Sequence, residues 1–173
     1  TSVKVGDRTL RARQLVVAVD GETAGPLVPG LPAPGWNSTI CFHYAAETPP
    51  LTRPIIALKG DRRGLINNLC VPSAVAPGYA PGGSALVCLS VLGDRPADSG
   101  LEDQVRRELA DWFGPATAKW RLLRQQKIRK SLPASPPGHQ APEPGPGPVF
   151  TCGDFTTSGS IEGAILSGLR TAN

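Results

Sequence analysis

Residues 149–173 read VFTCGDFTTSGSIEGAILSGLRTAN, and this stretch decides the fold more than any other part of the chain. Its first four residues predict a short strand that leads into Gly153-Asp154. A loop of small residues follows, and a helix is expected from about Ser160. The stretch is therefore expected to fold as a strand, an acidic turn, a small-residue loop and a helix. The apolar positions of that helix are Ile161, Ile165 and Leu169.

Two kinds of polar group come close together in this stretch. The carboxylate of Asp154, at the end of the strand, can accept hydrogen bonds from sugar-like hydroxyls. The loop 158–160 exposes backbone N–H groups at a helix N-terminus, which favours phosphate or another electron-rich oxygen. Gly163 and Ala164 allow the helix to approach a neighbouring backbone or a flat ligand. The stretch therefore suits a ligand with a polyol next to a phosphate.

These residues resemble the C-terminal flavin-binding motif of the FAD-dependent amine oxidase superfamily, which includes enzymes similar to phytoene desaturase. The match consists of Gly153-Asp154 followed by Ser160-Ile161-Glu162-Gly163-Ala164. The resemblance implies FAD as cofactor, with Asp154 bonded to its ribityl or pyrophosphate region and the Ile161 N–H facing the flavin O2/N1 edge. The cofactor-binding residues implied are Gly153, Asp154, Gly159, Ser160, Ile161, Gly163 and Ala164.

The resemblance extends to the rest of the chain. Residues 3–20 predict a hairpin and an apolar strand covered on both faces, like the part of the FAD domain that precedes the substrate domain. The expected fold class is α/β (α+β), with FAD-domain pieces flanking a mostly antiparallel sheet. The expected domains are a partial FAD-binding domain (1–35), a substrate-binding domain (36–135), a proline-rich linker (136–148) and the last FAD-domain strand and helix (149–173).

Apolar runs in the expected substrate domain predict its sheet. Strands are expected at 39–46, 54–59, 65–71, 85–92 and 119–130, and a helix at 99–113. Asn67 and Asn68 are unusual inside one of these strands. Because buried amides need partners, they are candidates for lining a substrate pocket.

The net charge of +4 comes from one region of the chain, residues 101–130. Lys119–Lys130 contains no acid. It can be a basic surface that binds nucleic acid or an anionic membrane, or it can be the solvated face of a strand. No nucleic-acid module accompanies it, so nucleic acid is not an expected partner, and membrane association has no further support. No apolar run approaches the ~20 residues of a membrane span.

The four cysteines lie far apart and form no C-x-x-C pair, so no metal site is expected. Each stands in an apolar stretch, which favours free buried thiols, with disulfides as the alternative. Free thiols indicate an intracellular location, in the cytoplasm or a plastid. No nucleophile–base pair stands out, so catalytic residues stay unassigned. This is expected where a flavin performs the chemistry.

The chain starts at Thr1, contains no Met and lacks the G-x-G-x-x-G dinucleotide fingerprint. It is therefore expected to be the C-terminal part of a longer enzyme and inactive alone. The expected activity is two-electron oxidation of an apolar organic small molecule by flavin. The alternatives are a non-catalytic relative or an interaction module of the same fold and, after these, a basic surface binder of nucleic acid or membrane.

Overall fold

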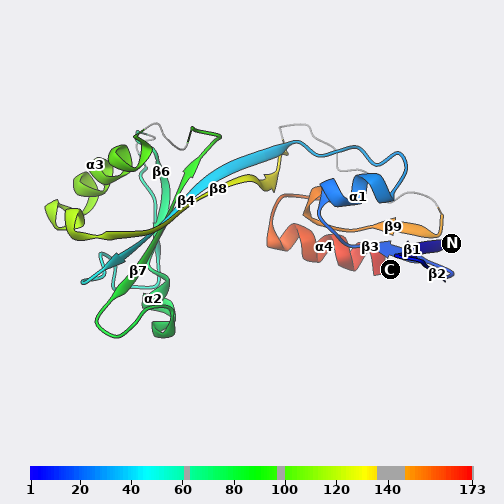
Figure 1. Cartoon of the computed structure of the whole chain (residues 1–173), viewed down its shortest axis with the longest axis horizontal. Helices are drawn as coiled ribbons and strands as arrows, with labels where there is room; N and C mark the ends of the chain where they lie inside the picture. Colours follow the sequence, from blue (N-terminus) through cyan, green and yellow to red (C-terminus); the bar gives the residue numbers. More distant parts are fainter. Residues whose placement is uncertain (61–62, 97–99, 136–146, 173) are drawn as a thin grey trace. The chain divides into compact units, whose positions relative to one another are not determined.

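The structure is a computed structural model and describes residues 1–60, 63–96, 100–135 and 147–172. The chain divides into two compact units (Figure 1). Unit 1 contains Thr1–Asn37 and Leu132–Asn173, and unit 2 contains Ser38–Ser131. The assignment of unit 1 to an FAD domain and of unit 2 to a substrate domain stays a prediction.

Unit 1 begins with a hairpin of β1 (Ser2–Val5) and β2 (Arg8–Arg11). The next strand, β3 (Leu15–Val17), pairs in parallel with β9 (Val149–Thr151), from the far end of the sequence. The predicted hairpin and both strands are thus confirmed. Within this chain β3 is covered on one face only: Val17 is buried and Leu15 packs against the same core, whereas Val16 is 51% exposed.

A short helix, α1 (Gly21–Leu27), follows β3 in unit 1. Asp20 caps it by accepting hydrogen bonds from the N–H groups of Glu22 and Thr23, at 3.1 and 3.0 Å. The bonds from Thr23 hold the pKa of Asp20 below its usual value. The core beneath this helix is small and consists of Val17, Ala24 and Phe155.

Unit 2 is built on a five-stranded sheet with the order β5-β6-β7-β4-β8. Its β5–β6, β6–β7 and β4–β7 pairs are antiparallel, which confirms the predicted fold class. The strands are β4 (Trp36–Ala46), β5 (Ile56–Ala57), β6 (Ile66–Cys70), β7 (Ala85–Leu92) and β8 (Arg121–Pro133).

The core of unit 2 lies on one face of this sheet. Alternate residues of β4 and β7 point into it, and α3 (Leu101–Phe113) covers it. The buried side chains include Ile40, Phe42, Tyr44, Val87, Leu89, Val91, Leu101, Val105 and Leu109. Because side chains alternate along a strand, the intervening residues form the opposite face, which we call the second face. It carries Cys41, His43, Asn68, Cys70, Leu86, Cys88 and Ser90.

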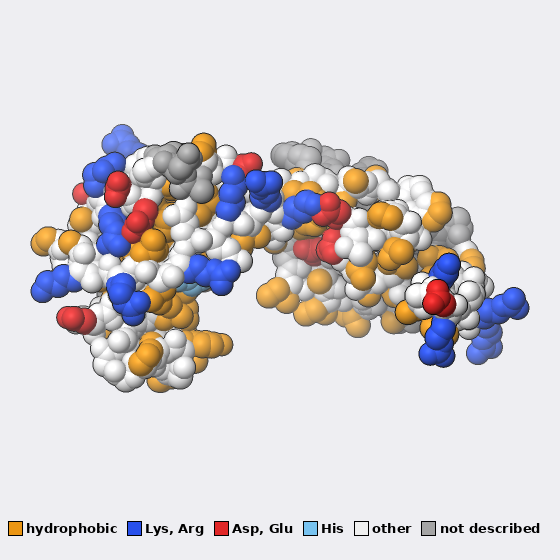
Figure 2. All heavy atoms as spheres, viewed as in Figure 1, with side chains coloured by type: hydrophobic (Ala, Val, Ile, Leu, Met, Phe, Trp, Pro, Cys, Tyr) orange, Lys and Arg blue, Asp and Glu red, His pale blue; other side chains and the backbone are white. Residues whose placement is uncertain are grey.

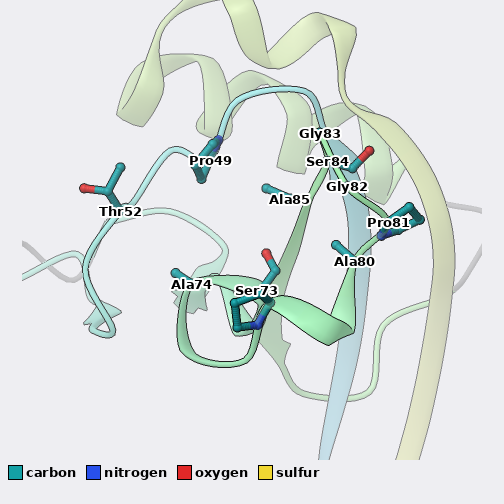
Figure 3. A pocket seen from close by; sticks show the side chains of 11 residues that line it. Pro49, Thr52, Ser73, Ala74, Ala80, Pro81, Gly82, Gly83, Ser84 and Ala85 are labelled. Carbon is teal, nitrogen blue, oxygen red and sulfur yellow. The ribbon is translucent and has the colours of Figure 1, made fainter.

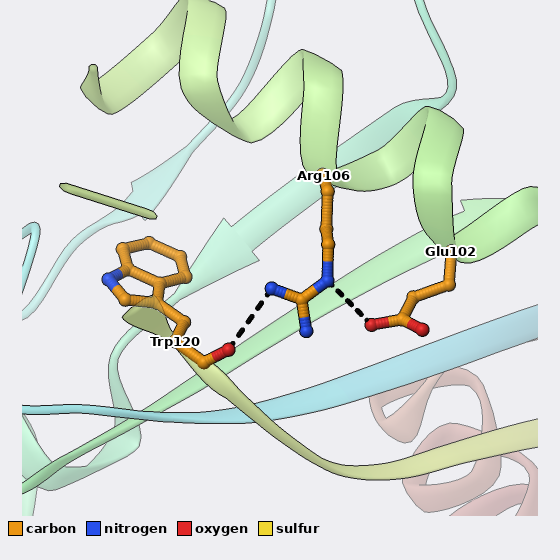
Figure 4. A network of polar contacts seen from close by, with 3 residues as sticks. All are labelled: Glu102, Arg106 and Trp120. Carbon is orange, nitrogen blue, oxygen red and sulfur yellow. Dashed lines mark hydrogen bonds and ion pairs between the residues drawn. The ribbon is translucent and has the colours of Figure 1, made fainter. Parts of the chain in front are cut away.

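Two polar interactions attach α3 to its surroundings. Arg106 donates from Nε to Glu102 Oε1 at 2.7 Å and from a terminal nitrogen to the Trp120 carbonyl at 3.1 Å (Figure 4). Its guanidinium also lies 5.2 Å from the centre of the Tyr44 ring. Two residues further along α3, Glu108 Oε2 accepts from the N–H groups of Leu65 and Ile66, at 2.6 and 3.2 Å. These contacts fix the entry to β6 and the exit from α3.

Short helical segments complete the fold. α2 (Pro72–Val75) and η1 (Pro77–Tyr79) connect β6 to β7, and η2 (Pro115–Lys119) connects α3 to β8. The predicted linker, 136–148, falls largely outside the described residues, as does Ser99 at the start of the predicted helix. Among the described residues, no helix has the length and apolar character needed to cross a membrane.

Candidate functional site

The turn after β9 is held by a buried hydroxyl network. The Gly153 N–H donates to Ser167 Oγ at 3.0 Å, and the Thr156 hydroxyl donates to the Gly153 carbonyl at 2.8 Å. Thr156 Oγ1 and Ser167 Oγ are themselves 2.5 Å apart. The network connects η3 (Asp154–Thr156) to the middle of α4 (Ile161–Ala172), so the turn and the helix are positioned together.

Asp154 stands at the start of η3, directly after Gly153. A side chain at Gly153 would place its Cβ 2.5 Å from the Phe155 ring, so the turn requires glycine while that ring fills the core. The Asp154 carboxylate is half-buried and receives no hydrogen bond from any described residue. Its oxygens are therefore available to a ligand that carries hydroxyl or N–H donors.

The N-terminus of α4 supplies the complementary donors. Ser160 Oγ accepts from the Gly163 N–H at 2.9 Å, and the Ser160 carbonyl accepts from Ala164 at 3.0 Å. The N–H groups of Ile161 and Glu162 have no acceptor among the described residues. Unpaired N–H groups and the helix dipole together favour negative charge at this position.

The glycines around this helix start allow the loop to pack against the helix. A Cβ at Gly163 would overlap the Ser158 carbonyl oxygen, and Thr157 Oγ1 donates to the Gly163 carbonyl at 2.8 Å. A Cβ at Gly159 would lie 3.0 Å from the Pro133 carbonyl oxygen. The close approach expected of Gly163 is thus made to its own loop, while Ala164 is exposed.

The predicted cofactor-binding residues therefore lie in one continuous segment, at the end of β9 and the start of α4. Asn67 and Asn68 lie in unit 2, on β6. Asn67 is exposed at an irregularity in the β6–β7 register, and Asn68 is opposite Ser90. Their role in a substrate pocket stays a prediction, as do the cofactor roles of the first set.

Sequence reasoning gives no role to Ser167, Thr156 or Thr157, although Ser167-Gly168 follows the matched motif. Ser167 is 3% exposed, although its neighbours in the sequence suggest an apolar helix. The signal that could have found it is a hydroxyl on the small-residue side of the helix, facing the Thr156-Thr157 pair. These three residues connect the turn at Gly153 to α4 by hydrogen bonds.

The apolar face of α4 points away from this support. Ile161 is 84% exposed, and Ile165, Leu166 and Leu169 are also exposed. Hydrophobic side chains gather along the α4 side of unit 1 (Figure 2). The helix thus packs through its small residues, Gly163 and Ser167, rather than through its large ones.

The basic stretch predicted from the sequence occupies β8, an edge strand of the unit 2 sheet. Lys127 forms an ion pair with Asp94 and donates to the Arg95 carbonyl. Arg121, Arg124 and Arg129 are exposed. Charged side chains on an edge strand discourage pairing with strands of other chains. This explains the basic composition of β8 without a nucleic acid or membrane partner.

All four cysteines are free thiols. In the part of the chain that the structure describes, no group of three His, Cys, Asp or Glu residues is arranged to hold a metal ion. The candidate site is made up of the Asp154 carboxylate, the first N–H groups of α4 and the hydroxyl network that connects them.

Several solved structures share this fold. An oxidoreductase from Methanosarcina mazei aligns with a TM-score of 0.73 and 16% identity, over 96% of this chain and 44% of that one. Cyclohexylamine oxidase from Brevibacterium oxydans IH-35A aligns with a TM-score of 0.66 and 17% identity, over 99% and 44%. Reduced UDP-galactopyranose mutase gives a TM-score of 0.56 and 16% identity, over 73% and 31%. The chain spans less than half the length of each.

The sequence was compared with curated proteins and with protein-family models. No curated protein matches the chain. The family model for flavin-containing amine oxidoreductases, in contrast, matches residues 1–173. Because that match extends over every residue, the chain belongs to the flavin-containing amine oxidoreductase family.

Proposed function

We propose that the protein containing this chain is an FAD-dependent oxidoreductase that removes two electrons from an organic substrate. The observation that carries the proposal is that, among the described residues, the Asp154 carboxylate and the N–H groups of Ile161 and Glu162 have no partner, within one short segment of the chain. A hydroxyl acceptor next to an anion site is the set of groups that a flavin with its ribityl chain and phosphates requires. The chain's own residues therefore fit the cofactor of its family.

Each residue has a defined part in this proposal. Asp154 would accept hydrogen bonds from the hydroxyl-bearing part of the cofactor. The Ile161 N–H would donate to the edge of the flavin, and the α4 dipole would stabilise negative charge there. Ser160 leaves these N–H groups free because it caps Gly163 instead. When bound, the flavin supplies the acceptor for the electron pair that leaves the substrate.

The substrate is proposed to be an apolar organic small molecule that binds to unit 2. A cavity of about 340 Å³ is lined by Pro54, Ile55, Ile56, Cys70, Val71, Pro72, Val75 and Tyr79. A second, of about 260 Å³, lies between Tyr79, Leu86 and Leu123. Tyr79 is 67% exposed and borders both. Their apolar walls support the substrate class, because ligand pockets that are mostly apolar select apolar ligands.

A third cavity differs in its lining. It has a volume of about 300 Å³ and lies beside α2 and the start of β7 (Figure 3). Its walls are small or polar residues, among them Thr52, Ser73, Gly82 and Ser84. Ser73 is already used to accept the Leu86 N–H at 3.0 Å. We therefore place the apolar substrate in the two cavities that share Tyr79 and not here.

The experiment that tests the proposal is expression of the complete protein and measurement of its visible flavin absorbance. Retained flavin that bleaches anaerobically with apolar amines or related compounds supports an oxidoreductase. A folded protein that takes up no flavin would favour the non-catalytic alternative. Flavin uptake without bleaching by any substrate would support the proposed cofactor site but contradict the proposed oxidoreductase activity.

A further inference from the structure

A row of nucleophilic side chains crosses the second face of the unit 2 sheet, outside the flavin site. Cys70 on β6 is the direct partner of Cys88 on β7. Cys88 is in turn the direct partner of His43 on β4. Directly opposite residues in an antiparallel sheet point to the same face, so two thiols and an imidazole stand side by side. The proposed flavin chemistry uses none of them.

The register gives Cys70 and Cys88 a geometry that a disulfide can adopt. Opposite residues have Cα atoms about 4.5–5.5 Å apart, within the range of about 4.4–6.8 Å found across disulfides. Cys41 is opposite Ser90 instead, so its relation to Cys88 is diagonal, at roughly 7–8 Å. The two direct partners are therefore the pair that can join without movement of the strands.

Two further observations distinguish this pair from ordinary buried cysteines. Cys70 lines the apolar cavity of about 340 Å³ bordered by Tyr79, so a small solute can reach Cys70, next to Cys88. On the other side, His43 Nδ1 is buried and has no hydrogen-bond partner in the described part of the chain. A buried ring nitrogen without a hydrogen-bond partner costs free energy, so it calls for an explanation.

The thiols are neutral near pH 7, so their oxidation requires a base that removes a proton, and the imidazole of His43 can be that base. Burial raises the pKa of Cys70, and burial with the nearby thiols of Cys70 and Cys41 raises the pKa of Cys88 to about 11. A thiolate, not a thiol, is the nucleophile in oxidation. A proton acceptor beside Cys88 is therefore required for the pair to react.

We propose that Cys70 and Cys88 form a redox-active dithiol that hydrogen peroxide converts to a cross-strand disulfide, with His43 as the proton acceptor. His43 takes the Cys88 proton, and the Cys88 sulfur attacks one peroxide oxygen as the O–O bond breaks. The leaving hydroxide takes the proton from His43 and departs as water, which leaves a sulfenic acid on Cys88.

The second step closes the disulfide. The Cys70 sulfur attacks the sulfenic sulfur, the S–O bond breaks, and hydroxide leaves with the Cys70 proton as a second water. Two thiols lose two electrons and one peroxide gains them, so no further reactant is needed. A reducing dithiol restores the starting state by exchange.

The test uses the complete protein, treated with hydrogen peroxide and digested without reduction for mass spectrometry. A peptide pair linked through Cys70 and Cys88, and separated again by dithiothreitol, is the expected product. Cys70→Ser is expected to stop the reaction at a sulfenic acid on Cys88, which dimedone traps. Cys41→Ser is the matched control on the same face and is expected to leave the linked product unchanged.

A rate measurement tests the part played by His43. His43→Gln keeps a polar side chain but accepts no proton, and is expected to slow disulfide formation by about tenfold or more. An unchanged rate would remove His43 from the proposal. The dithiol itself is overturned if Cys70 and Cys88 stay reduced while Cys152 oxidises, or if Cys41 is linked in place of Cys70. These outcomes do not depend on whether the protein holds flavin.

Discussion

Ser167, in the middle of α4, accepts the hydrogen bond of the Gly153 N–H through its hydroxyl oxygen at 3.0 Å. This bond connects the turn that presents Asp154 to the helix whose first N–H groups have no acceptor among the described residues. Because Ser167 is almost fully buried, water does not replace it readily. The two halves of the proposed flavin site are therefore positioned by one side chain that touches no ligand.

Ser167→Ala should weaken the site and the fold together. The change leaves the part-buried Gly153 N–H without its acceptor and removes one of the two hydrogen bonds of the Thr156 hydroxyl, which costs about 1–3 kcal/mol of unfolding free energy. Flavin affinity should fall as well, because the Asp154 turn loses its anchor. Urea unfolding and flavin titration of the complete protein measure the two effects. Ser2→Ala, at an exposed serine, is the control, and equal behaviour of the two variants would contradict the anchoring role.

Gly163→Ala should destabilise unit 1, although alanine favours helices. The new Cβ would overlap the Ser158 carbonyl oxygen, so the first turn of α4 must shift, at a cost of about 1–3 kcal/mol. Gly168→Ala is the matched control in the same helix, because its Cβ meets no atom within 4 Å. The control should gain up to about 1 kcal/mol. Thermal unfolding that ranks the two variants in the opposite order would show that the Ser158–Gly163 contact is wrong.

Glu108→Ala should destabilise unit 2. Glu108 is 6% exposed, and its carboxylate accepts the N–H groups of Leu65 and Ile66. Their loss should lower the unfolding free energy by about 1–3 kcal/mol. Asp111→Ala, on the exposed side of the same helix, should stay within about 0.5 kcal/mol of the wild type. Denaturant unfolding of both variants checks this, and a similar small effect at both positions would argue against the buried acceptor.

Alkaline pH should destabilise unit 2. Burial and neighbouring thiols raise the pKa of Cys88 from 9.0 to about 11, and burial raises the pKa of Tyr44. A raised pKa in the folded state means that stability is present below the unfolded pKa, near 9, and is lost as the pH rises through about 11. Urea unfolding measured across this range should show the fall.

The contribution of one thiol to that fall can be separated. Cys88→Ala removes the group with the raised pKa, so its unfolding free energy should decline less steeply with pH than that of the wild type. Cys152→Ala, in unit 1, should follow the wild-type slope. Identical slopes for all three proteins would show that Cys88 does not titrate as its burial implies.

The two long strands β4 and β7 of unit 2 could be predicted from the sequence because each has one buried face, whereas the strand expected at 54–59 is only the short, exposed β5. The alternation of Ile40, Phe42 and Tyr44 predicts β4, and the apolar run 85–92 predicts β7. α3 is similarly clear from the spacing of Leu101, Val105 and Leu109. In each case the apolar side chains recur with the period of the strand or helix and face the core of unit 2, so the local pattern agrees with the tertiary packing.

Unit 1 could be predicted less fully, for a physical reason. An apolar pattern shows which residues avoid water but not which neighbour covers them. Val16 and Ile161 follow the pattern of buried residues, and both are exposed in this chain. The large apolar residues of α4 likewise suggest the packing face, whereas Gly163 and Ser167 form it. Hydroxyl networks such as Thr156–Ser167 leave no periodic signal, since they depend on contacts made after the chain folds.

Flavin affinity of Asp154→Ala in the complete protein tests the central proposal most directly. The apoprotein of the variant and of Asp111→Ala would be titrated with FAD and followed by quenching of flavin fluorescence. Loss of a charge-assisted hydrogen bond, at about 1.5–3 kcal/mol, predicts an increase of about tenfold or more in Kd for Asp154→Ala only. An unchanged Kd for Asp154→Ala in a normally folded protein would contradict the assignment of this turn to the cofactor.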